Sequence, residues 1–181
     1  GQSFFVYGGL TEMHVFQGAT QAEITRAASD YGGNETTPWT LTVFNGIPIF
    51  NNGVDAPQMW SPMSLATKLV DLTNWPASTT AKVIRGFKNY LVALNVARPD
   101  LTDPQLVKWS HSADPRTVPT SWDHTDATKD AGEQQLAETD DKLVDCRTLG
   151  PVNVVYGEKS TTRMSFIGAP LIFDFKTAFP T

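Results

Sequence analysis

The chain has 181 residues, of which 40% are hydrophobic and 10% aromatic, and its formal net charge is −5. This composition is typical of a globular protein, because a disordered chain has too few apolar residues to bury. The negative charge gives no overall basic field that would attract nucleic acid, and no apolar run is long enough for a membrane-spanning helix.

The first predicted element is a hairpin in SFFVYGGLTEMHVFQG, residues 3–18. Apolar and aromatic side chains flank Gly8-Gly9, and we place the corner there because glycine accepts the backbone angles of tight turns. The next segment, TQAEITRAASD, starts with Thr20 and has Glu23 three residues later. That spacing matches a capping box and predicts one or two helical turns.

A second hairpin is predicted in WTLTVFNGIPIFNNG, residues 39–53. Asn45-Gly46 stands between two apolar runs, which is the strongest short-range signal for a two-residue hairpin turn. Farther along, SLATKLVDLTNWPAS (residues 64–78) has apolar residues at spacings that suit either a short helical turn or an irregular link.

Two further hairpins follow. GFKNYLVALNV, residues 86–96, turns at Lys88-Asn89, where we expect Asn89 to take the left-handed conformation more readily than Lys88. VDCRTLGPVNVVYGEKS, residues 144–160, turns at Gly150-Pro151. Its Cys146 is the single cysteine of the chain, so an internal disulfide is excluded, and we expect it to be a small buried hydrophobic residue.

A third strand is predicted after each of these last three hairpins. PQMWSP (57–62) and PQLVKWSH (104–111) both run from Pro-Gln through apolar residues to Trp-Ser. TTRMSFIG (161–168) holds the corresponding place in the last unit. The chain therefore contains a repeating unit of three or four strands.

Aromatic residues recur with the same units. Phe44 and Phe87 are 43 residues apart, and Trp60 and Trp109 are 49 apart. Units of roughly 40 to 50 residues with three or four strands are typical of the blades of a β-propeller. We therefore predict an all-β fold that is part of a β-propeller of antiparallel blades, with these four aromatic residues packed between blades. A two-sheet sandwich is the alternative.

The composition changes in residues 110–143, which we interpret as an acidic loop insertion. The segment has eight Asp or Glu and three Lys or Arg, so the rest of the chain is neutral. A cation site at Asp123, His124, Asp126 and Asp130 is one alternative, but the spacing of an EF-hand loop is missing.

A carboxylate pair for glycoside hydrolysis is another alternative, but none of the acidic residues of the insertion lies within an apolar strand. We therefore expect a solvated loop, with no catalytic residue, metal or cofactor. The candidates for an interface or for the wall of a channel are four carboxylates: Asp123, Asp126, Asp130 and Glu133.

Three segments carry a resemblance to a known family: VFNGIPIFNNGVDAPQMW, FKNYLVALNV and LVKWSHSADPRTVPTSWDHTDATKDAGEQQLAET. They resemble virion structural proteins of the tail nozzle, or tail tubular protein B, type from short-tailed bacteriophages and their prophages. The string VKWSH-ADP-TVP-SW-D-TD-TKDAGE is the most specific part. The resemblance extends from about Trp39 onward.

The resemblance implies a propeller-bearing subunit that self-associates, commonly as a ring of six, at the distal end of the tail. Such a ring extends the channel through which DNA passes, and it holds fibres or other tail proteins. The implied role is structural, without enzymatic activity or cofactor, in a virion assembled from proteins made in the cytoplasm of the bacterial host. Because nozzle proteins are several times longer, we expect residues 1–181 to be a single β domain that is a fragment of a larger propeller protein.

The place of the acidic insertion in such a ring is open. In the lumen it would repel the phosphates of passing DNA, so that the genome slides without sticking. Outside the ring it would contact a fibre or a neighbouring subunit.

Two other functions are alternatives. A carbohydrate-binding or carbohydrate-cleaving propeller module would recognise the host surface, with Trp75 and Trp122 stacked on sugars. A propeller that serves as a protein–protein platform outside any virus is the other.

Overall fold

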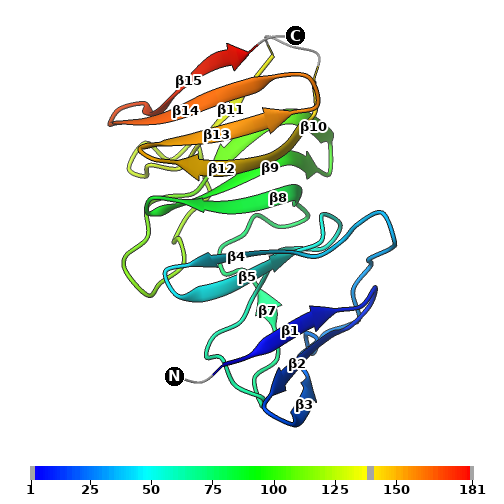
Figure 1. The fold of residues 1–181 in the computed structure, drawn as a ribbon. Coiled ribbons are helices and arrows are strands. Elements are labelled where there is room, and N and C mark those ends of the chain that lie inside the picture. The colour runs from blue at the N-terminus through cyan, green and yellow to red at the C-terminus, as the bar shows by residue number, and fades with distance from the viewer. Residues whose placement is uncertain (1–2, 138–140, 180–181) are drawn as a thin grey trace.

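The computed structural model describes residues 3–137 and 141–179, and it confirms the all-β prediction. Within these residues the strands form four antiparallel sheets, and there is no helix. Each sheet is built from consecutive strands of one continuous segment, and the sheets follow one another along the molecule (Figure 1). The alternative prediction, a sandwich, would have two sheets, whereas the described residues form four. No described residue belongs to a helix that could cross a membrane.

The first two sheets come from the N-terminal part of the chain. Sheet 1 has the order β1 (Phe5–Gly8), β2 (Met13–Gln17), β3 (Thr20–Glu23). Sheet 2 has the order β4 (Thr40–Phe44), β5 (Ile47–Asn51), β6 (Gln58–Met59), β7 (Val70–Asp71). The helical turn predicted from the capping box is wrong, because Thr20 opens strand β3.

The last two sheets have longer strands. Sheet 3 contains β8 (Thr80–Phe87), β9 (Tyr90–Arg98), β10 (Leu101–Trp109) and β11 (Gly132–Gln135). Sheet 4 contains β12 (Leu143–Leu149), β13 (Val152–Gly157), β14 (Thr161–Gly168) and β15 (Ile172–Phe179). The predicted third strands correspond to β6, β10 and β14, so the repeating unit is real. The acidic insertion is not a loop throughout, because its residues 132–135 form β11, which pairs with β10.

Two-residue turns close three of the four predicted hairpins. Asn45 and Gly46 have φ angles of 52° and 83°, as a turn with two left-handed residues requires. At the next corner Phe87 pairs with Tyr90, but the left-handed residue is Lys88, with φ 52°. The expectation for Asn89 is therefore wrong. Gly150 has the equivalent place, with φ 59°.

The first hairpin differs from its prediction. β1 ends at Gly8 and β2 starts at Met13, and the amide of Gly9 donates to the carbonyl of Glu12 at 2.8 Å, so the connection is a longer turn. The tight corner of sheet 1 lies at Gly18-Ala19, between β2 and β3. Gly8 could not take a larger side chain, since an added Cβ would lie 2.5 Å from the ring of Trp39.

Three hydrophobic cores fill the spaces between successive sheets. The core between sheets 1 and 2 includes Met13, Val15, Ile24, Tyr31, Phe50, Trp60 and Leu69. The core between sheets 2 and 3 includes Phe44, Ile49, Ile84, Leu91, Ala93 and Trp122. The core between sheets 3 and 4 includes Phe87, Val92, Trp109, Cys146, Val155, Met164 and Phe173. The fold is thus a column of sheets stacked face to face (Figure 1).

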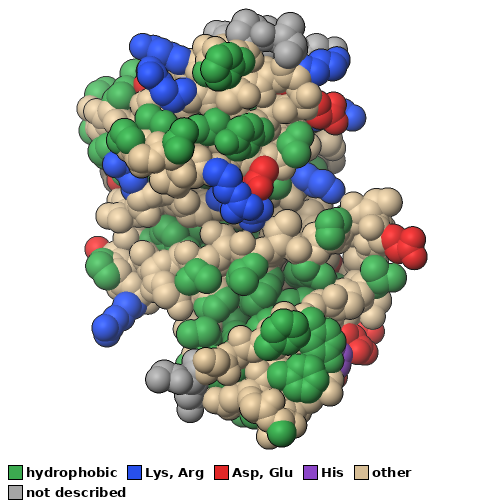
Figure 2. Space-filling model, in the orientation of Figure 1, with side chains coloured by type: hydrophobic (Ala, Val, Ile, Leu, Met, Phe, Trp, Pro, Cys, Tyr) green, Lys and Arg blue, Asp and Glu red, His purple; other side chains and the backbone are tan. Residues whose placement is uncertain are grey.

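The spaces between the sheets are wedge-shaped. The first strand of sheet 3, β8, contacts the first strands of both neighbouring sheets, β4 and β12. The last strands of sheets 3 and 4, β11 and β15, line a cleft of about 1000 Å³. Between sheets 1 and 2 the wedge opens on the other side, where a groove of about 810 Å³ lies between β1 and β4 (Figure 2).

Candidate functional site

The four predicted packing residues all lie in the cores between sheets. Phe44 and Phe87 are each the last residue of the first strand of their sheet, and each faces the following sheet. The 43-residue spacing therefore marks equivalent positions in sheets 2 and 3. Phe87 meets the ring of Phe173 in sheet 4, with 5.8 Å between ring centroids.

The two tryptophans are not equivalent. Trp60 faces sheet 1, where its ring meets Phe4 at 5.1 Å, whereas Trp109 faces sheet 4 and meets Phe173 at 5.4 Å. Met59, which precedes Trp60, packs against the core between sheets 2 and 3. It therefore faces the following sheet, as Trp109 does in sheet 3. Because neighbouring residues of an extended segment point to opposite faces, a shift of one residue explains why the two rings face opposite sheets, while the longer strands of sheet 3 lengthen the spacing.

An ion pair connects the first strands of sheets 3 and 4. Nε of Arg85 donates to Asp145 Oδ1 at 2.8 Å, and Nη2 donates to Oδ2 at 3.2 Å. Nη1 of Arg85 also lies 3.5 Å from the carbonyl oxygen of Leu41 in sheet 2. The buried guanidinium thus contacts three successive sheets at their first strands.

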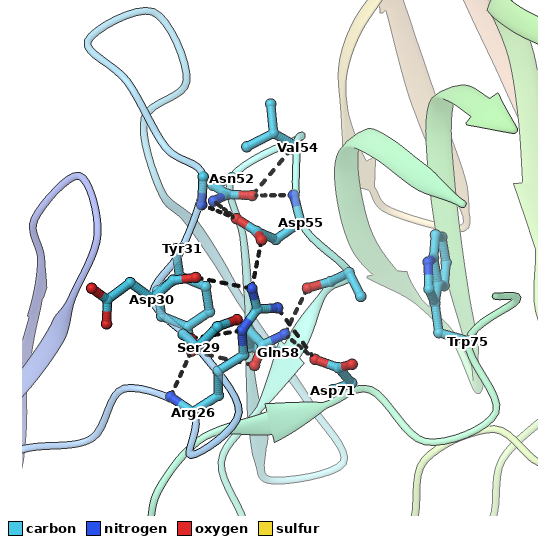
Figure 3. A network of polar contacts seen from close by, with 12 residues as sticks. Arg26, Ser29, Asp30, Tyr31, Asn52, Val54, Asp55, Gln58, Asp71 and Trp75 are labelled. Atoms are coloured by element: carbon cyan, nitrogen blue, oxygen red, sulfur yellow. Dashed lines mark hydrogen bonds and ion pairs between the residues drawn. The ribbon is translucent and has the colours of Figure 1, made fainter. Parts of the chain in front are cut away.

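A second polar network joins sheets 1 and 2 (Figure 3). The carboxylate of Asp55 accepts hydrogen bonds at 2.8 Å from Arg26, from the Gly32 amide and from Asn52. The guanidinium of Arg26 lies 4.8 Å from the ring centre of Tyr31, and burial raises the pKa of Tyr31 to about 12. The polar groups of this network are hydrogen-bonded to one another, so the network fixes the irregular connection between β3 and β4.

The acidic insertion folds against the hairpin corners of sheets 2 and 3. The side-chain amide of Asn45 donates to the carbonyls of Asp114 and Thr117, at 3.0 and 3.1 Å. Asn74 donates to the carbonyl of Pro119 at 3.2 Å. Trp122 is buried, and its ring meets Trp75 edge to face at 4.7 Å. This part of the insertion is thus a loop with exposed residues 114–117, and the buried Trp122 and the hydrogen bonds hold it to the core.

The four candidate carboxylates form two groups, and the structure does not bring all of them together. Asp123 and Asp126 are each hydrogen-bonded by the hydroxyl and the amide of a threonine two residues later. These bonds lower the pKa of both carboxyls. Their local turns leave Asp123 exposed and Asp126 half-buried.

Asp130 and Glu133 form hydrogen bonds and ion pairs within the body of the protein. Asp130 accepts hydrogen bonds from Ser112 at 2.8 Å and from Tyr90 at 3.2 Å. Glu133 accepts from Arg98 at 2.9 Å and from Lys108, directly opposite on β10, at 3.0 Å. Burial raises the pKa of Glu133, but the hydrogen bonds from Arg98 and Lys108 lower it by more. The pKa of this carboxyl is therefore below its usual value. These two residues stabilise sheet 3.

The prediction from the sequence did not include these cationic partners, although one signal was present. Lys108 stands between apolar residues in LVKW, where a charge is buried only if it is paired. The partner Glu133 could not be found, because the pairing of β10 with β11 spans more than twenty residues.

Two further expectations concern chemistry. Among the described residues, no group of three or more His, Cys, Asp or Glu lies close enough to hold a metal ion. Cys146 is buried, as predicted, and burial raises the pKa of its thiol to about 11. It is therefore a protonated, inert thiol at neutral pH.

Replacing Asn45 with glycine should loosen the insertion. Glycine keeps the left-handed turn but removes the two hydrogen bonds to Asp114 and Thr117, so we expect a loss of about 1 to 2 kcal/mol of unfolding free energy. Amide hydrogen exchange should become faster within residues 111–123. Asn95→Gly removes a side-chain bond at another left-handed asparagine and is the control. Equal exchange of the insertion in both variants would contradict this anchor.

No protein-family model matches the chain, and no curated protein matches it significantly.

Proposed function

We propose that the chain is a structural module of a bacteriophage tail, of the nozzle or tail tubular type, and that its four sheets are successive blades of a β-propeller. The observation that carries the proposal is the order of the strands. Each sheet is a meander of consecutive strands, and the first strands β4, β8 and β12 lie next to one another. In a propeller the first strand of each blade lies nearest the axis.

The shape of the cleft between sheets 3 and 4 supports the same arrangement. Blades that radiate from an axis approach at their first strands and diverge at their last strands. β8 contacts β12, while β11 and β15 line a cleft of about 1000 Å³. Sheet 1 departs from the pattern, since its groove with sheet 2 opens between the first strands β1 and β4. The proposed radial order therefore rests on sheets 2 to 4.

A rigid column of this kind suits a mechanical role. The sheets are held by aromatic cores and by polar ties such as Arg85–Asp145 and Arg26–Asp55. The carbohydrate alternative loses its two aromatic candidates, because Trp75 and Trp122 pack against each other. We therefore favour conduit, seal and attachment point as the function, with self-association and other tail proteins as partners. Asp123 is exposed, which allows contact with a neighbouring subunit.

Labelling of virions tests the proposal. An antibody raised against the chain should label the distal tail of particles produced by the phage or prophage that encodes it, in negative-stain electron microscopy. Deletion of the coding segment should give filled heads that do not infect. Unlabelled virions, together with full infectivity after the deletion, would refute the tail assignment.

A further inference from the structure

The two ends of the column expose sheet faces that differ in chemistry. On the outward face of sheet 1 the side chains of Phe5, Tyr7, His14 and Phe16 lie together. The ring of Tyr7 stacks on Phe16 at 5.7 Å and on His14 at 5.2 Å, and Phe5 is 67% exposed. Figure 2 shows hydrophobic side chains gathered over this sheet. Between the inner sheets, comparable aromatic rings are buried.

The outward face of sheet 4 carries a row of cations. Arg147 on β12 pairs with Val154 on β13, Val154 pairs with Arg163 on β14, and Arg163 pairs with Lys176 on β15. Opposed residues share a face, so the three cations cross the sheet in one line. Apolar side chains flank the row, among them Leu149 and Phe179, which are 68% and 71% exposed.

The charges of the two faces are complementary. Beside the aromatic patch of sheet 1 stand two carboxylates: Glu12, which lies 3.2 Å from Nε2 of His14, and Glu23, which forms an ion pair with Lys68. On sheet 4, Arg147 and Lys176 have ion-pair partners on their own strands, whereas Arg163 has none among the residues that the structure describes. A guanidinium binds well on the face of an aromatic ring, and it also pairs with carboxylates.

We infer that these faces bind each other between two copies of the chain, head to tail: the outward face of β1–β3 of one copy on the outward face of β12–β15 of the next. The inference rests on the proposed function and names the surfaces of self-association. It continues the stacking of sheets within the molecule. Two sheet 4 faces would instead place two cation rows against each other, which like-charge repulsion disfavours.

The arrangement has consequences for assembly. A head-to-tail contact is heterologous, so it gives a closed ring or an open filament. From the strand spacings, the face of sheet 1 measures roughly 14 by 16 Å. The area of this face is well below the roughly 800 Å² that each partner buries in a standard interface. We therefore expect weak, concentration-dependent association of the isolated chain.

Disulfide trapping tests which faces meet. Phe5→Cys and Arg163→Cys place thiols on the two faces, and the buried Cys146 adds little background. After mild oxidation, a mixture of the two single variants should give a dimer on a non-reducing gel, and the double variant should give a ladder. Each single variant alone should stay monomeric. If one single variant alone gave as much dimer as the mixture, or if the mixture gave no dimer, the head-to-tail contact would be overturned.

A charge reversal gives a second measurement. Arg163→Glu should weaken self-association about tenfold in sedimentation equilibrium, because a favourable contact becomes a repulsive one. Arg116→Glu makes the same change on the insertion and should leave association unchanged; circular dichroism checks that both variants fold. Equal association of the two variants would overturn the inference. Virion labelling with no trapped dimer would refute the contact and leave the tail function standing.

Discussion

Replacing Trp109 with alanine is expected to lower the free energy of unfolding by about 3 to 5 kcal/mol, which is typical of a large aromatic residue removed from a core. The ring is buried between sheets 3 and 4 and contacts Phe173 and Phe175. Its Nε1 donates to the carbonyl of Asp130 at 2.8 Å. The substitution therefore leaves a cavity and also a carbonyl without its donor. Urea unfolding followed by circular dichroism measures the loss.

The packing around the indole shows which element depends on it. A Cβ added at Gly132 would lie 2.3 Å from Cζ2 of Trp109, so the start of β11 lies directly on the indole. Removing the indole should therefore loosen β11 together with the ion pair of Lys108 and Glu133. Phe179→Ala, at an exposed residue of sheet 4, is the control and should change stability by less than about 0.5 kcal/mol. A Trp109→Ala variant as stable as this control would contradict the role of the core.

The hairpins could be predicted from the sequence because their signals are local. Asn45-Gly46 needs only its own backbone angles and the apolar runs beside it, and the structure has the turn there. The recurrence of Phe44 and Phe87 also reflects a local rule, since each ends the first strand of its sheet. Stacking of sheets then follows, because a half-apolar sheet must bury that face.

The failures came from contacts that the local sequence patterns do not show. Thr20 and Glu23 match a capping box, but pairing of β2 with β3 takes these residues into a strand. Lys88 accepts a left-handed angle that favours glycine or asparagine, and its ammonium lies 5.3 Å from the ring centre of Phe166 in sheet 4. Such a contact between sheets compensates a poor turn residue, and no local pattern reveals it.

The candidate carboxylates show the same limit. Asp123 and Asp126 bond within their own turns, as their threonines two residues later suggest. Asp130 and Glu133 look similar in sequence, but Tyr90 and Arg98, which lie some forty residues earlier, take them into the body of sheet 3. Composition alone therefore overstates the free negative charge of the insertion.

Replacing Arg85 with alanine is expected to cost about 3 kcal/mol, near the lower end of the range for broken buried ion pairs. The side chain of Arg85 is 9% exposed, while that of Asp145 is 27% exposed and keeps some access to water. Arg147 still lies 3.2 Å from Asp145 and offsets part of the loss. Because Arg147 is 61% exposed, Arg147→Ala should cost less than about 1 kcal/mol.

A double-mutant cycle separates the pair from its surroundings. If Arg85 and Asp145 stabilise the junction of β8 and β12 together, the double variant should lose about 1.5 to 3 kcal/mol less than the sum of the single losses. Additive losses would mean that each side chain acts alone, through the Leu41 carbonyl in one case and the Cys146 amide in the other. A coupled pair at the first strands, where β8 contacts β12, is what the proposed radial array would need to hold its sheets at a fixed angle.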